Sequence, residues 1–425
     1  MNILLIRPKP NKETIGLQSV MICEPLELMT LKSVLSHNGH NVTILDMIIE
    51  KKPLHHYVRL YQPAVTGITG YISHVNVIKE YAHVIKSVNS QIKVYCGGVH
   101  AEVCPEDFIC ENIDGVCNSA EDFYNTVGCG DLGYRFPDRD LPDKYRKKYY
   151  YLFHKNCALI KTSYGCPYNC KFCFCKEISP YIVRDLDLVM EELKSIKQEE
   201  VYIVDDNFLY DRKKLERFCD KLERLGIKKK YLVYGRADFI TQNEDIIKRL
   251  KRSGLRAVIV GIEAATQEEL DSYNKKTKRS DNIEAVRILK KHDIEVYATV
   301  ILGEKWDKSD FNRLYRFLKE LGIVFVNLQP FTPMPGTQYF DEYKDELIIS
   351  RNEYEKWDMA HIVIKPKKLS VRAYYMQIVK LYFLLSLSPK SCIYMIRKYG
   401  LKDCLKLSFG AAKITRQYLA KIVKG

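Results

Sequence analysis

The sequence contains no hydrophobic run long enough to cross a bilayer. Its apolar segment Leu381–Leu387 is closely flanked by Lys380 and Lys390, whereas a membrane-spanning helix needs about 20 apolar residues. Internal repeats and low-complexity stretches are missing too. No secretory signal opens the chain, because Met1–Arg7 is too short and lacks a small-residue cleavage site. We therefore expect a cytoplasmic protein whose fourteen cysteines stay reduced.

Acidic residues are almost missing from the C-terminal part of the chain. From Ile364 onward, fourteen Lys and Arg residues stand against one acid, Asp403, and this part carries nearly all of the net charge of +14. Tyrosines and Phe383 interleave with the lysines. Three roles remain open: a helical cap with a solvated basic face, a basic amphipathic surface for anionic lipid, and RNA binding.

The cysteine-rich segment lacks the second half of a zinc site. Cys166, Cys170 and Cys173 follow the spacing C-x₃-C-x₂-C, with Cys175 just after, but the next cysteine is Cys219. Zinc ribbons and knuckles need a second ligand pair within reach. Three thiolates on one loop can instead bind three irons of a [4Fe–4S] cluster, which leaves the fourth iron free to hold a small molecule. We predict such a metal site at Cys166, Cys170 and Cys173.

Strand and helix patterns alternate over most of the 425 residues, which suffice for two or three domains. In the first 128 residues, short apolar strands are expected at 3–6, 42–45, 65–69, 92–96 and 115–117, and helices at 26–38, 73–88 and 106–111. This order predicts a parallel, doubly wound sheet. A second series has strands at 158–162, 201–204, 231–234, 257–262, 295–301 and 324–328, with helices between them.

The cysteine spacing resembles the radical S-adenosylmethionine (SAM) superfamily. Further motifs that follow the expected strands are similar to that family: Val204-Asp205-Asp206-Asn207-Phe208, Gly235-Arg236-Ala237-Asp238, Gly261-Ile262-Glu263 and Pro333-Met334-Pro335-Gly336-Thr337. The resemblance implies an open, partial (β/α)₆ barrel with its chemistry at the carboxyl ends of the strands. It also implies SAM-binding residues, which are Phe172, Asp205, Asp206, Arg236, Gly261, Glu263 and Gly303.

The N-terminal part resembles the cobalamin-binding domain that precedes many radical SAM barrels. The resemblance is carried by Gly67-Ile68-Thr69-Gly70 and Gly97-Gly98-Val99-His100-Ala101, and by Glu121. The D-x-H-x-x-G motif, which supplies a cobalt-ligating histidine in other B12 proteins, is absent. The resemblance implies a cobalamin site formed by Thr69, Gly70, Tyr71, Gly97, Gly98, His100 and Glu121.

These resemblances predict four parts in an α/β protein. They are a Rossmann-like cobalamin-binding domain at 1–130, a linker at 131–150, a radical SAM partial barrel at 151–345 and a helical basic region at 346–425. The implied cofactors are a [4Fe–4S] cluster, SAM and cobalamin. The implied enzyme is a cobalamin-dependent radical SAM methyltransferase that acts on an unactivated carbon or phosphorus centre through a 5′-deoxyadenosyl radical and methylcobalamin.

Three other functions stay open from the sequence: a cobalamin-dependent radical cyclase or rearrangement enzyme, a radical SAM tRNA-modifying enzyme, and a non-catalytic corrinoid or cluster sensor. The expected partners are a small-molecule or lipid substrate and a reductant such as flavodoxin or ferredoxin, under anaerobic conditions. Nucleic acid is not expected. The basic C-terminal region suggests peripheral contact with the inner face of the membrane.

Overall fold

The computed structural model describes residues 1–424, apart from the side chains of Leu17, Asp143, Lys176, Glu177 and Lys424. The chain forms two compact units. The first unit comprises residues 1–16, 24–149 and 350–358, and the second comprises 17–23, 150–349 and 359–425. Residues 131–149, expected as a linker, thus belong to the first unit, and residues 350–358 return to it after the barrel. The four-part division remains a prediction.

The first unit is built on a five-stranded parallel sheet. In spatial order its strands are β3 (Asn41–Asp46), β1 (Asn2–Arg7), β4 (Val65–Thr69), β5 (Lys93–Gly97) and β6 (Gly115–Val116). This is a flavodoxin-like order, in which the strand sequence reverses between β1 and β4. Ligands of such sheets bind at the carboxyl ends of the strands beside the reversal. The doubly wound sheet predicted from the sequence is confirmed.

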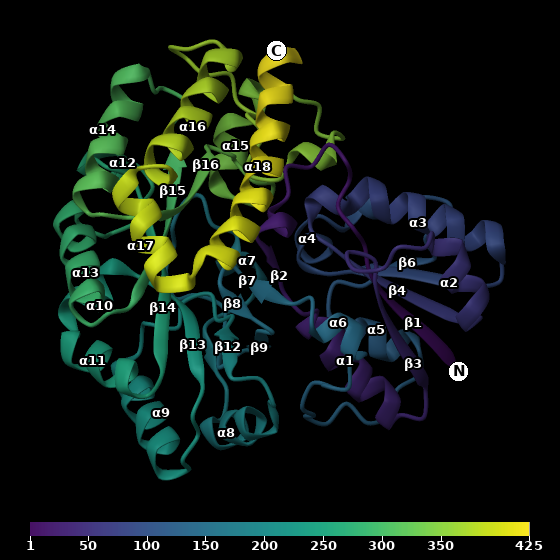
Figure 1. Ribbon diagram of the computed structural model, residues 1–425. Coiled ribbons are helices and arrows are strands. Elements are labelled where there is room, and N and C mark those ends of the chain that lie inside the picture. The colour runs from purple at the N-terminus through teal and green to yellow at the C-terminus, as the bar shows by residue number, and fades with distance from the viewer. Residues whose placement is uncertain (425) are drawn as a thin grey trace. The chain divides into compact units, whose positions relative to one another are not determined.

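Helices cover both faces of this sheet. The helices are α1 (Leu26–His37), α2 (Leu54–Tyr61), α3 (Val75–Val88), α4 (Val99–Val103) and α5 (Ala120–Thr126). In Figure 1, α1 and α5 lie on one face, and α2 and α3 on the other. The helix expected at 106–111 is only a 3₁₀ turn, Pro105–Phe108, because Ile109 already has extended dihedral angles.

The segment 131–149, which contains α6 (Asp143–Arg146), packs on the first unit through buried polar contacts. Arg139 Nη1 lies 2.9 Å from Glu24 Oε1, and the Tyr149 hydroxyl donates to Asp46 Oδ2 at 3.1 Å. Glu24, Asp46 and Tyr149 are all buried. A linker is expected here from the sequence, but the tyrosine and arginine side chains of the segment bury apolar area while their polar ends contact acids.

The second unit contains an open sheet of six parallel strands in chain order. These are β9 (Ala158–Ile160), β12 (Glu200–Ile203), β13 (Lys230–Gly235), β14 (Leu255–Glu263), β15 (Glu295–Leu302) and β16 (Phe325–Pro330). The long crossover helices are α8 (Leu186–Ser195), α9 (Arg212–Arg224), α11 (Glu244–Arg252), α13 (Arg279–Lys291) and α14 (Lys308–Glu320), with short helices α10 (Ala237–Gln242) and α12 (Gln267–Ser272) between them. Figure 1 shows the helices outside the curved sheet. The partial barrel is confirmed.

Smaller elements complete the second unit. They are the sheet β2 (Met21–Ile22), β7 (Tyr150–Tyr151) and β8 (His154–Lys155), the pair β10 (Ser163–Tyr164) and β11 (Ile182–Val183), and helices α7 (Cys175–Ile178) and α15 (Gln338–Tyr343). Three C-terminal helices follow, α16 (Val371–Ser386), α17 (Pro389–Tyr399) and α18 (Leu401–Lys424). Among the described residues, none of the helices has the length and apolar character that a bilayer crossing requires.

Candidate functional site

The three-cysteine loop leaves the barrel at the carboxyl end of its first strand, and Asp205 anchors it there. Asp205 follows β12, and its carboxylate accepts hydrogen bonds from the backbone N–H of Thr162 at 2.6 Å and of Ser163 at 3.1 Å. The hydroxyls of the same two residues also donate to it. The fully buried Asp205 thus fixes the start of the loop.

A buried lysine completes this anchor. Lys214 of α9 lies 3.0 Å from Asp205 Oδ2 and 3.1 Å from the Ser163 hydroxyl, and it has no exposed surface. Burial lowers the pKa of Lys214, while the charge of Asp205 opposes that shift. An ion pair in this position neutralises the Asp205 carboxylate. Asp205, predicted to bind SAM, is therefore occupied by protein groups.

A glycine allows the loop to turn toward the cysteines. Gly165 has φ of +66°, and a Cβ there would lie 2.3 Å from the carbonyl oxygens of Ser179 and Pro180. Farther along, the N–H of Lys171 donates to the Tyr273 carbonyl at 3.1 Å, and the Asn274 side chain donates to the Asn169 carbonyl at 2.7 Å. The loop is thereby tied to the segment after α12.

The three cysteines of the loop do not form a compact group of potential ligand atoms in this structure. Thiolates on a single zinc at about 2.3 Å lie within roughly 4.6 Å of one another. Among the described residues, three potential ligand atoms approach within 4.8 Å of one another only at His100, Cys104 and Asp107, so the three-cysteine loop does not qualify. The thiols of Cys166, Cys170 and Cys173 still interact electrostatically. Three thiols on one loop are the donor set that a [4Fe–4S] cluster with one open iron requires.

The thiols differ in how readily they ionise. Burial raises the pKa of Cys166 and of Cys170, although the positive charges of Lys275 and Arg236 oppose this at Cys170. A hydrogen bond from Cys175 lowers the pKa of Cys173. The Cys175 thiol has its pKa raised by that same contact, and its sulfur also lies 3.5 Å from Asp206 Oδ1. The contact therefore favours the Cys173 thiolate, with the Cys175 thiol as its hydrogen-bond donor.

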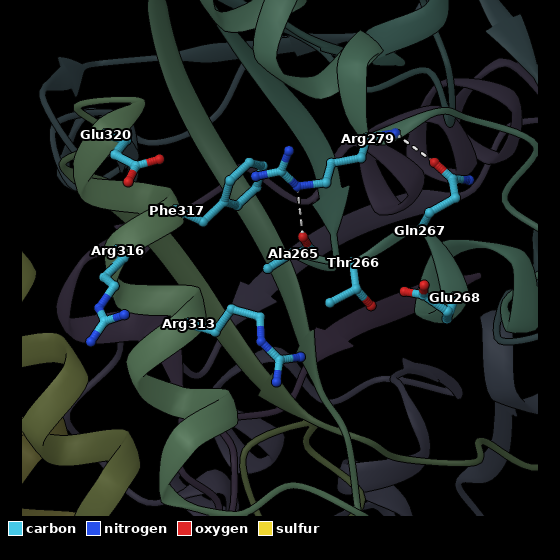
Figure 2. A pocket seen from close by; sticks show the side chains of 9 residues that line it. All are labelled: Ala265, Thr266, Gln267, Glu268, Arg279, Arg313, Arg316, Phe317 and Glu320. Carbon is cyan, nitrogen blue, oxygen red and sulfur yellow. Dashed lines mark hydrogen bonds between the residues drawn. The ribbon is translucent and has the colours of Figure 1, made fainter.

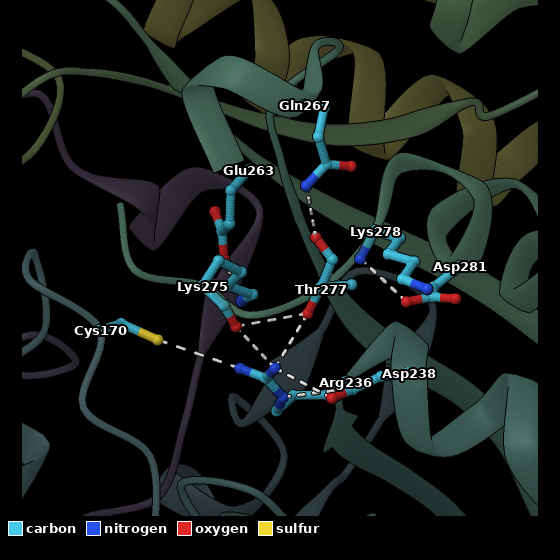
Figure 3. Close-up of polar contacts among 9 residues, drawn as sticks. All are labelled: Cys170, Arg236, Asp238, Glu263, Gln267, Lys275, Thr277, Lys278 and Asp281. Carbon is cyan, nitrogen blue, oxygen red and sulfur yellow. Dashed lines mark hydrogen bonds and ion pairs between the residues drawn. The ribbon is translucent and has the colours of Figure 1, made fainter. Parts of the chain in front are cut away.

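Arg236 connects the loop to the strand ends (Figure 3). Its guanidinium lies 3.7 Å from the centre of the Tyr168 ring, and Nη1 lies 3.9 Å from Cys170 Sγ. Asp238 accepts from its Nε and Nη2, both at 3.0 Å. Nη2 donates to the Lys275 carbonyl at 2.7 Å as well. Arg236 thus presents one nitrogen to the cluster side while the rest of its guanidinium is held by protein.

Glu263 and Lys275 form a buried ion pair on the same side (Figure 3). Lys275 Nζ lies 3.0 Å from Glu263 Oε1 and 5.8 Å from the centre of the Phe172 ring. Glu263 ends β14 with φ of +58°. A Cβ on Gly261 would lie 2.3 Å from the Glu263 carboxylate and 2.6 Å from the Lys275 ammonium, so glycine leaves room for the pair.

The other predicted SAM residues differ in exposure. Asp206 is exposed, unlike its neighbour Asp205. Phe172 is half-buried and meets Tyr273 edge-on at 5.9 Å. Gly303 packs beneath Trp306, and its carbonyl accepts from the Tyr374 hydroxyl at 2.9 Å. The carboxyl ends of β9, β12, β13 and β14 thus gather Cys170, Asp205, Arg236 and Glu263 at one end of the barrel.

In the first unit, the predicted cobalamin residues follow β4, β5 and β6. Gly98 has φ of +103°, and a Cβ there would lie 2.7 Å from Thr69 Oγ1 and 2.9 Å from the Gly70 carbonyl, so glycine lets two strand ends meet. Thr69, Gly70, Gly97 and Gly98 are half-buried, and Tyr71 is exposed. These glycine-rich ends lie beside the reversal of strand order, which suits a large ligand.

The other two residues predicted to bind cobalamin, His100 and Glu121, lie in different environments. The imidazole of His100 is buried, and its Nε2 lies 2.7 Å from Asp107 Oδ2, a carboxylate that Arg351 and Tyr354 of the same unit also contact. His100 is thus engaged by protein. Glu121 is exposed in the first turn of α5. The assignment of all seven residues to cobalamin remains a prediction.

The sequence did not predict a role for three side chains near the site. Lys214 and Lys275 are buried lysines, and lysine is almost never fully buried without a partner. Asn207 is 3% exposed, and neither polar atom of its side chain has a partner among the described residues. It lies within the quoted Val204–Phe208 motif, which offered the only sequence signal. An orphaned buried amide next to the site suits a bound ligand or water.

A separate groove lies outside the barrel, behind the end of β14 (Figure 2). It measures about 490 Å³ and is lined from the loop before α12 and from α13 and α14, including Arg279, Arg313 and Arg316. Arg279 Nε donates to the Ala265 carbonyl at 2.9 Å. No cluster cysteine lines this groove. It is therefore distinct from the loop and strand ends described above.

Comparison with known proteins agrees with this geometry. A family model described as "Radical SAM superfamily" matches residues 160–318, and one described as "B12 binding domain" matches residues 13–127. The chain is 24% identical over 417 residues to the hopanoid C-3 methylase of Methylococcus capsulatus, covering 89% of this chain and 79% of that protein.

Two other similarities are narrower or limited to the fold. The anaerobic magnesium-protoporphyrin IX monomethyl ester cyclase of Cereibacter sphaeroides is 29% identical over 221 residues, which cover 50% of this chain and 36% of that protein. The structure of the radical SAM methyltransferase TsrM from Kitasatospora setae, with cobalamin and a [4Fe–4S] cluster bound, superimposes with a TM-score of 0.67 at 16% identity, covering 92% of this chain and 89% of that one. This last likeness concerns the fold.

The barrel, its three-cysteine loop and the family matches define a radical SAM enzyme. The chain combines this barrel with an N-terminal B12-binding domain, which is the domain pair of the cobalamin-dependent radical SAM enzymes that it resembles. The cofactors of this family are a [4Fe–4S] cluster, SAM and cobalamin, as expected from the sequence.

Proposed function

We propose that this enzyme transfers a methyl group to an unactivated carbon or phosphorus centre. The observation that carries the proposal is a three-thiol loop at the carboxyl end of an open six-stranded barrel, in a chain that also has a B12-binding domain. The similarity to a hopanoid methylase over most of both chains supports methyl transfer. When bound, the cluster and SAM supply a 5′-deoxyadenosyl radical and cobalamin supplies the methyl group.

The chain itself provides placement. We assign the cluster to Cys166, Cys170 and Cys173, held by a loop that the buried pair of Asp205 and Lys214 anchors. Radical chemistry depends on reacting groups being held at near-attack distance, and orientation contributes on the order of 7–11 kcal/mol. A loop fixed at its start by four hydrogen bonds and an ion pair can hold a cluster in such a position.

SAM offers an ammonium, a carboxylate and a ribose diol for recognition. We assign its binding to the exposed carboxylate of Asp206, the Nη1 side of Arg236 and the pair of Glu263 and Lys275, with Phe172, Gly261 and Gly303 lining the space. Glu263 suits the SAM ammonium, and Lys275 suits its carboxylate. Asp205 then acts by positioning the loop.

We assign cobalamin to the strand ends of the first unit. Thr69, Gly70 and Tyr71 stand at or just after the end of β4, Gly97 and Gly98 do so at β5, and all five residues are at least partly exposed. The imidazole of the buried His100 is already hydrogen-bonded to Asp107. We therefore assign His100 a structural role beneath this surface and no direct contact with cobalt. Glu121 contributes a carboxylate from the start of α5.

A cobalamin-dependent cyclisation is the second candidate, because the chain is also similar to the anaerobic cyclase from Cereibacter sphaeroides. Both reactions use the same cofactors. The product distinguishes them, since methyl transfer adds one methylene (~14 Da) to the substrate and cyclisation adds none.

The remaining parts of the proposal concern the partners. We propose a small-molecule or lipid substrate and a low-potential reductant of the flavodoxin or ferredoxin class, which family chemistry requires as an electron source. Peripheral membrane contact of the basic C-terminal helices belongs to the proposal as well. It is independent of the chemistry at the barrel.

The test uses full-length protein reconstituted anaerobically with iron, sulfide and hydroxocobalamin. We expect about four irons per chain and a corrinoid absorption band that survives desalting. With SAM and a reductant, we expect formation of 5′-deoxyadenosine, and a candidate substrate should gain the mass of one methylene. Zinc at the three thiols, or the absence of SAM cleavage, would contradict the proposal. About eight irons per chain would favour a tRNA-modifying enzyme.

A further inference from the structure

The longest helix described in the structure, α18, exposes an apolar stripe on one face. Along α18, the large apolar side chains of one face recur at intervals of three or four residues or their multiples. They are Leu401, Leu405, Phe409, Leu419 and Val423, and all are exposed. Phe409 is 77% exposed and Val423 82%. Ala412 and Arg416, also exposed, continue the same face between Phe409 and Leu419.

The opposite face of α18 is already used for packing. Tyr418 is buried, and its ring lies 5.9 Å from that of Tyr375 and 6.4 Å from that of Tyr382, both on α16. Figure 1 shows α18 alongside α16. The helix is thus attached to the second unit by one side, and the apolar stripe on its other side is available to a partner.

Positive charge borders the stripe. Lys402, Lys406 and Lys413 are exposed. Each directly follows a residue of the stripe in the sequence, so these lysines lie along one edge of the stripe. The single acid of the helix, Asp403, lies off this face and pairs with Lys155 at 2.6 Å. Lys402, Lys413 and Arg416 have no ion-pair partner among the described residues. The exposed face of α18 therefore combines aliphatic groups with uncompensated cations.

The preceding helix extends this surface. Among the residues described in α17, none is buried, and Ile393 and Ile396 are exposed beside Lys390 and Arg397. Helices α17 and α18 pack against one another. Exposed aliphatic residues with flanking lysines thus continue over two consecutive helices.

We propose that the exposed face of α17 and α18 binds the surface of an anionic lipid bilayer. An amphipathic helix of this composition lies in the interface, with its apolar stripe among the acyl chains and its lysines at the head groups. A second copy of this chain is disfavoured, because pairing would bring two faces of the same positive charge together. RNA is disfavoured because the ring of Phe409 is the single aromatic group of the stripe, and its other residues offer no ring for base stacking. The inference deepens the membrane contact named in the proposed function and is independent of the proposed reaction.

The first test measures co-sedimentation of the full-length protein with vesicles. Binding is expected with mixed phosphatidylcholine and phosphatidylglycerol vesicles, and little with phosphatidylcholine alone. Phe409→Glu should weaken binding roughly 10-fold or more, because it removes an apolar anchor and adds a negative charge. Its matched control is Leu60→Glu on α2 of the first unit, where the leucine is 60% exposed. Leu60→Glu should bind like the parent.

The second test addresses charge. Replacing Lys402, Lys413 and Arg416 together with Gln should weaken partitioning roughly 100-fold, since each cation near an anionic surface contributes about fivefold. The control replaces Lys228, Lys248 and Lys308, which are also exposed, and should change little. Thermal melting confirms that each variant is folded, and 5′-deoxyadenosine formation in solution tests the chemistry separately.

Three outcomes would overturn the inference. These are equal binding to neutral and anionic vesicles, no effect of Phe409→Glu on vesicle binding, and a dimer in solution that Phe409→Glu dissociates. Loss of SAM cleavage with intact vesicle binding would count against the proposed function only.

Discussion

The ammonium of Lys275 lies 3.0 Å from the carboxylate of Glu263, and both side chains are buried. The pair joins the end of β14 to a segment that follows α12. The Lys275 carbonyl also accepts from Arg236, which reaches toward Cys170 (Figure 3). One buried salt bridge thus links the strand ends of the barrel to the cysteine loop.

Replacing Lys275 with Met should destabilise the protein by about 3–5 kcal/mol, because the buried Glu263 carboxylate loses its counter-charge. Denaturant unfolding measures this, with Lys276→Met at the exposed neighbour as the control. The double variant K275M/E263Q should recover much of the loss. The reduction potential of the reconstituted cluster should fall in Lys275→Met, because a nearby positive charge favours the reduced form. An unchanged potential and stability would contradict this role.

Replacing Lys214 with Met should reduce iron loading. Asp205 then keeps its hydrogen bonds from Thr162 and Ser163 but loses the ammonium that neutralises it, at a cost of about 3–5 kcal/mol. Lys213→Met, at the exposed position before it, is the matched control. Iron per chain and the unfolding midpoint are measured together. Full loading in Lys214→Met would show that the anchor does not hold the loop.

Single replacements of Cys166, Cys170 or Cys173 by Ala should abolish the cluster and SAM cleavage. Cys175→Ala should retain both, because the loop provides three ligands and Cys175 only hydrogen-bonds to Cys173. Iron analysis and 5′-deoxyadenosine formation provide the measurements. Retained cleavage in Cys170→Ala would refute the ligand assignment.

The stability of the first unit should fall as the pH decreases from about 6.5 to about 4. Burial and the charge of Arg7 lower the pKa of His74 to about 4, and its Nδ1 accepts from the Tyr71 N–H at 3.3 Å. The unfolded chain then binds a proton that the folded chain does not, so stability is present above pH 6.5 and declines below it. The effect is at most about 3 kcal/mol.

The measurement for His74 compares unfolding at several pH values in the parent and in His74→Asn. The variant should lose less stability on acidification. His55→Asn, at an exposed histidine, should follow the parent. Parallel pH curves for the parent and His74→Asn would rule out this contribution.

The fold was largely predictable because its strands are short, apolar and separated by turn residues. The cysteine loop was predictable because its ligands are close together in sequence. The difference in burial between Asp205 and Asp206 was not predictable. Adjacent residues after a strand point to opposite sides, so Asp205 points into the protein and Asp206 points outward. Lys275 was missed because its partner lies twelve residues away and the pairing depends on the left-handed backbone of Glu263.

The segment Ser350–Asp358 was also beyond prediction, because its partners are distant in the chain. Arg351 contacts Asp107 at 2.5 Å, the Tyr354 hydroxyl donates to the same residue at 2.9 Å, and the Ile15 N–H donates to Asp358 at 2.7 Å. The local sequence of residues 350–358 does not predict these contacts.

This returning segment affects how the protein is made. On the ribosome, Asp107 emerges long before Arg351 and Tyr354 exist, so the N-terminal unit stays incomplete until the whole barrel has been translated. An excised fragment ending at Tyr149 would lack the same piece permanently. The last segment of the B12-binding unit is therefore synthesised only after the radical SAM barrel has been translated.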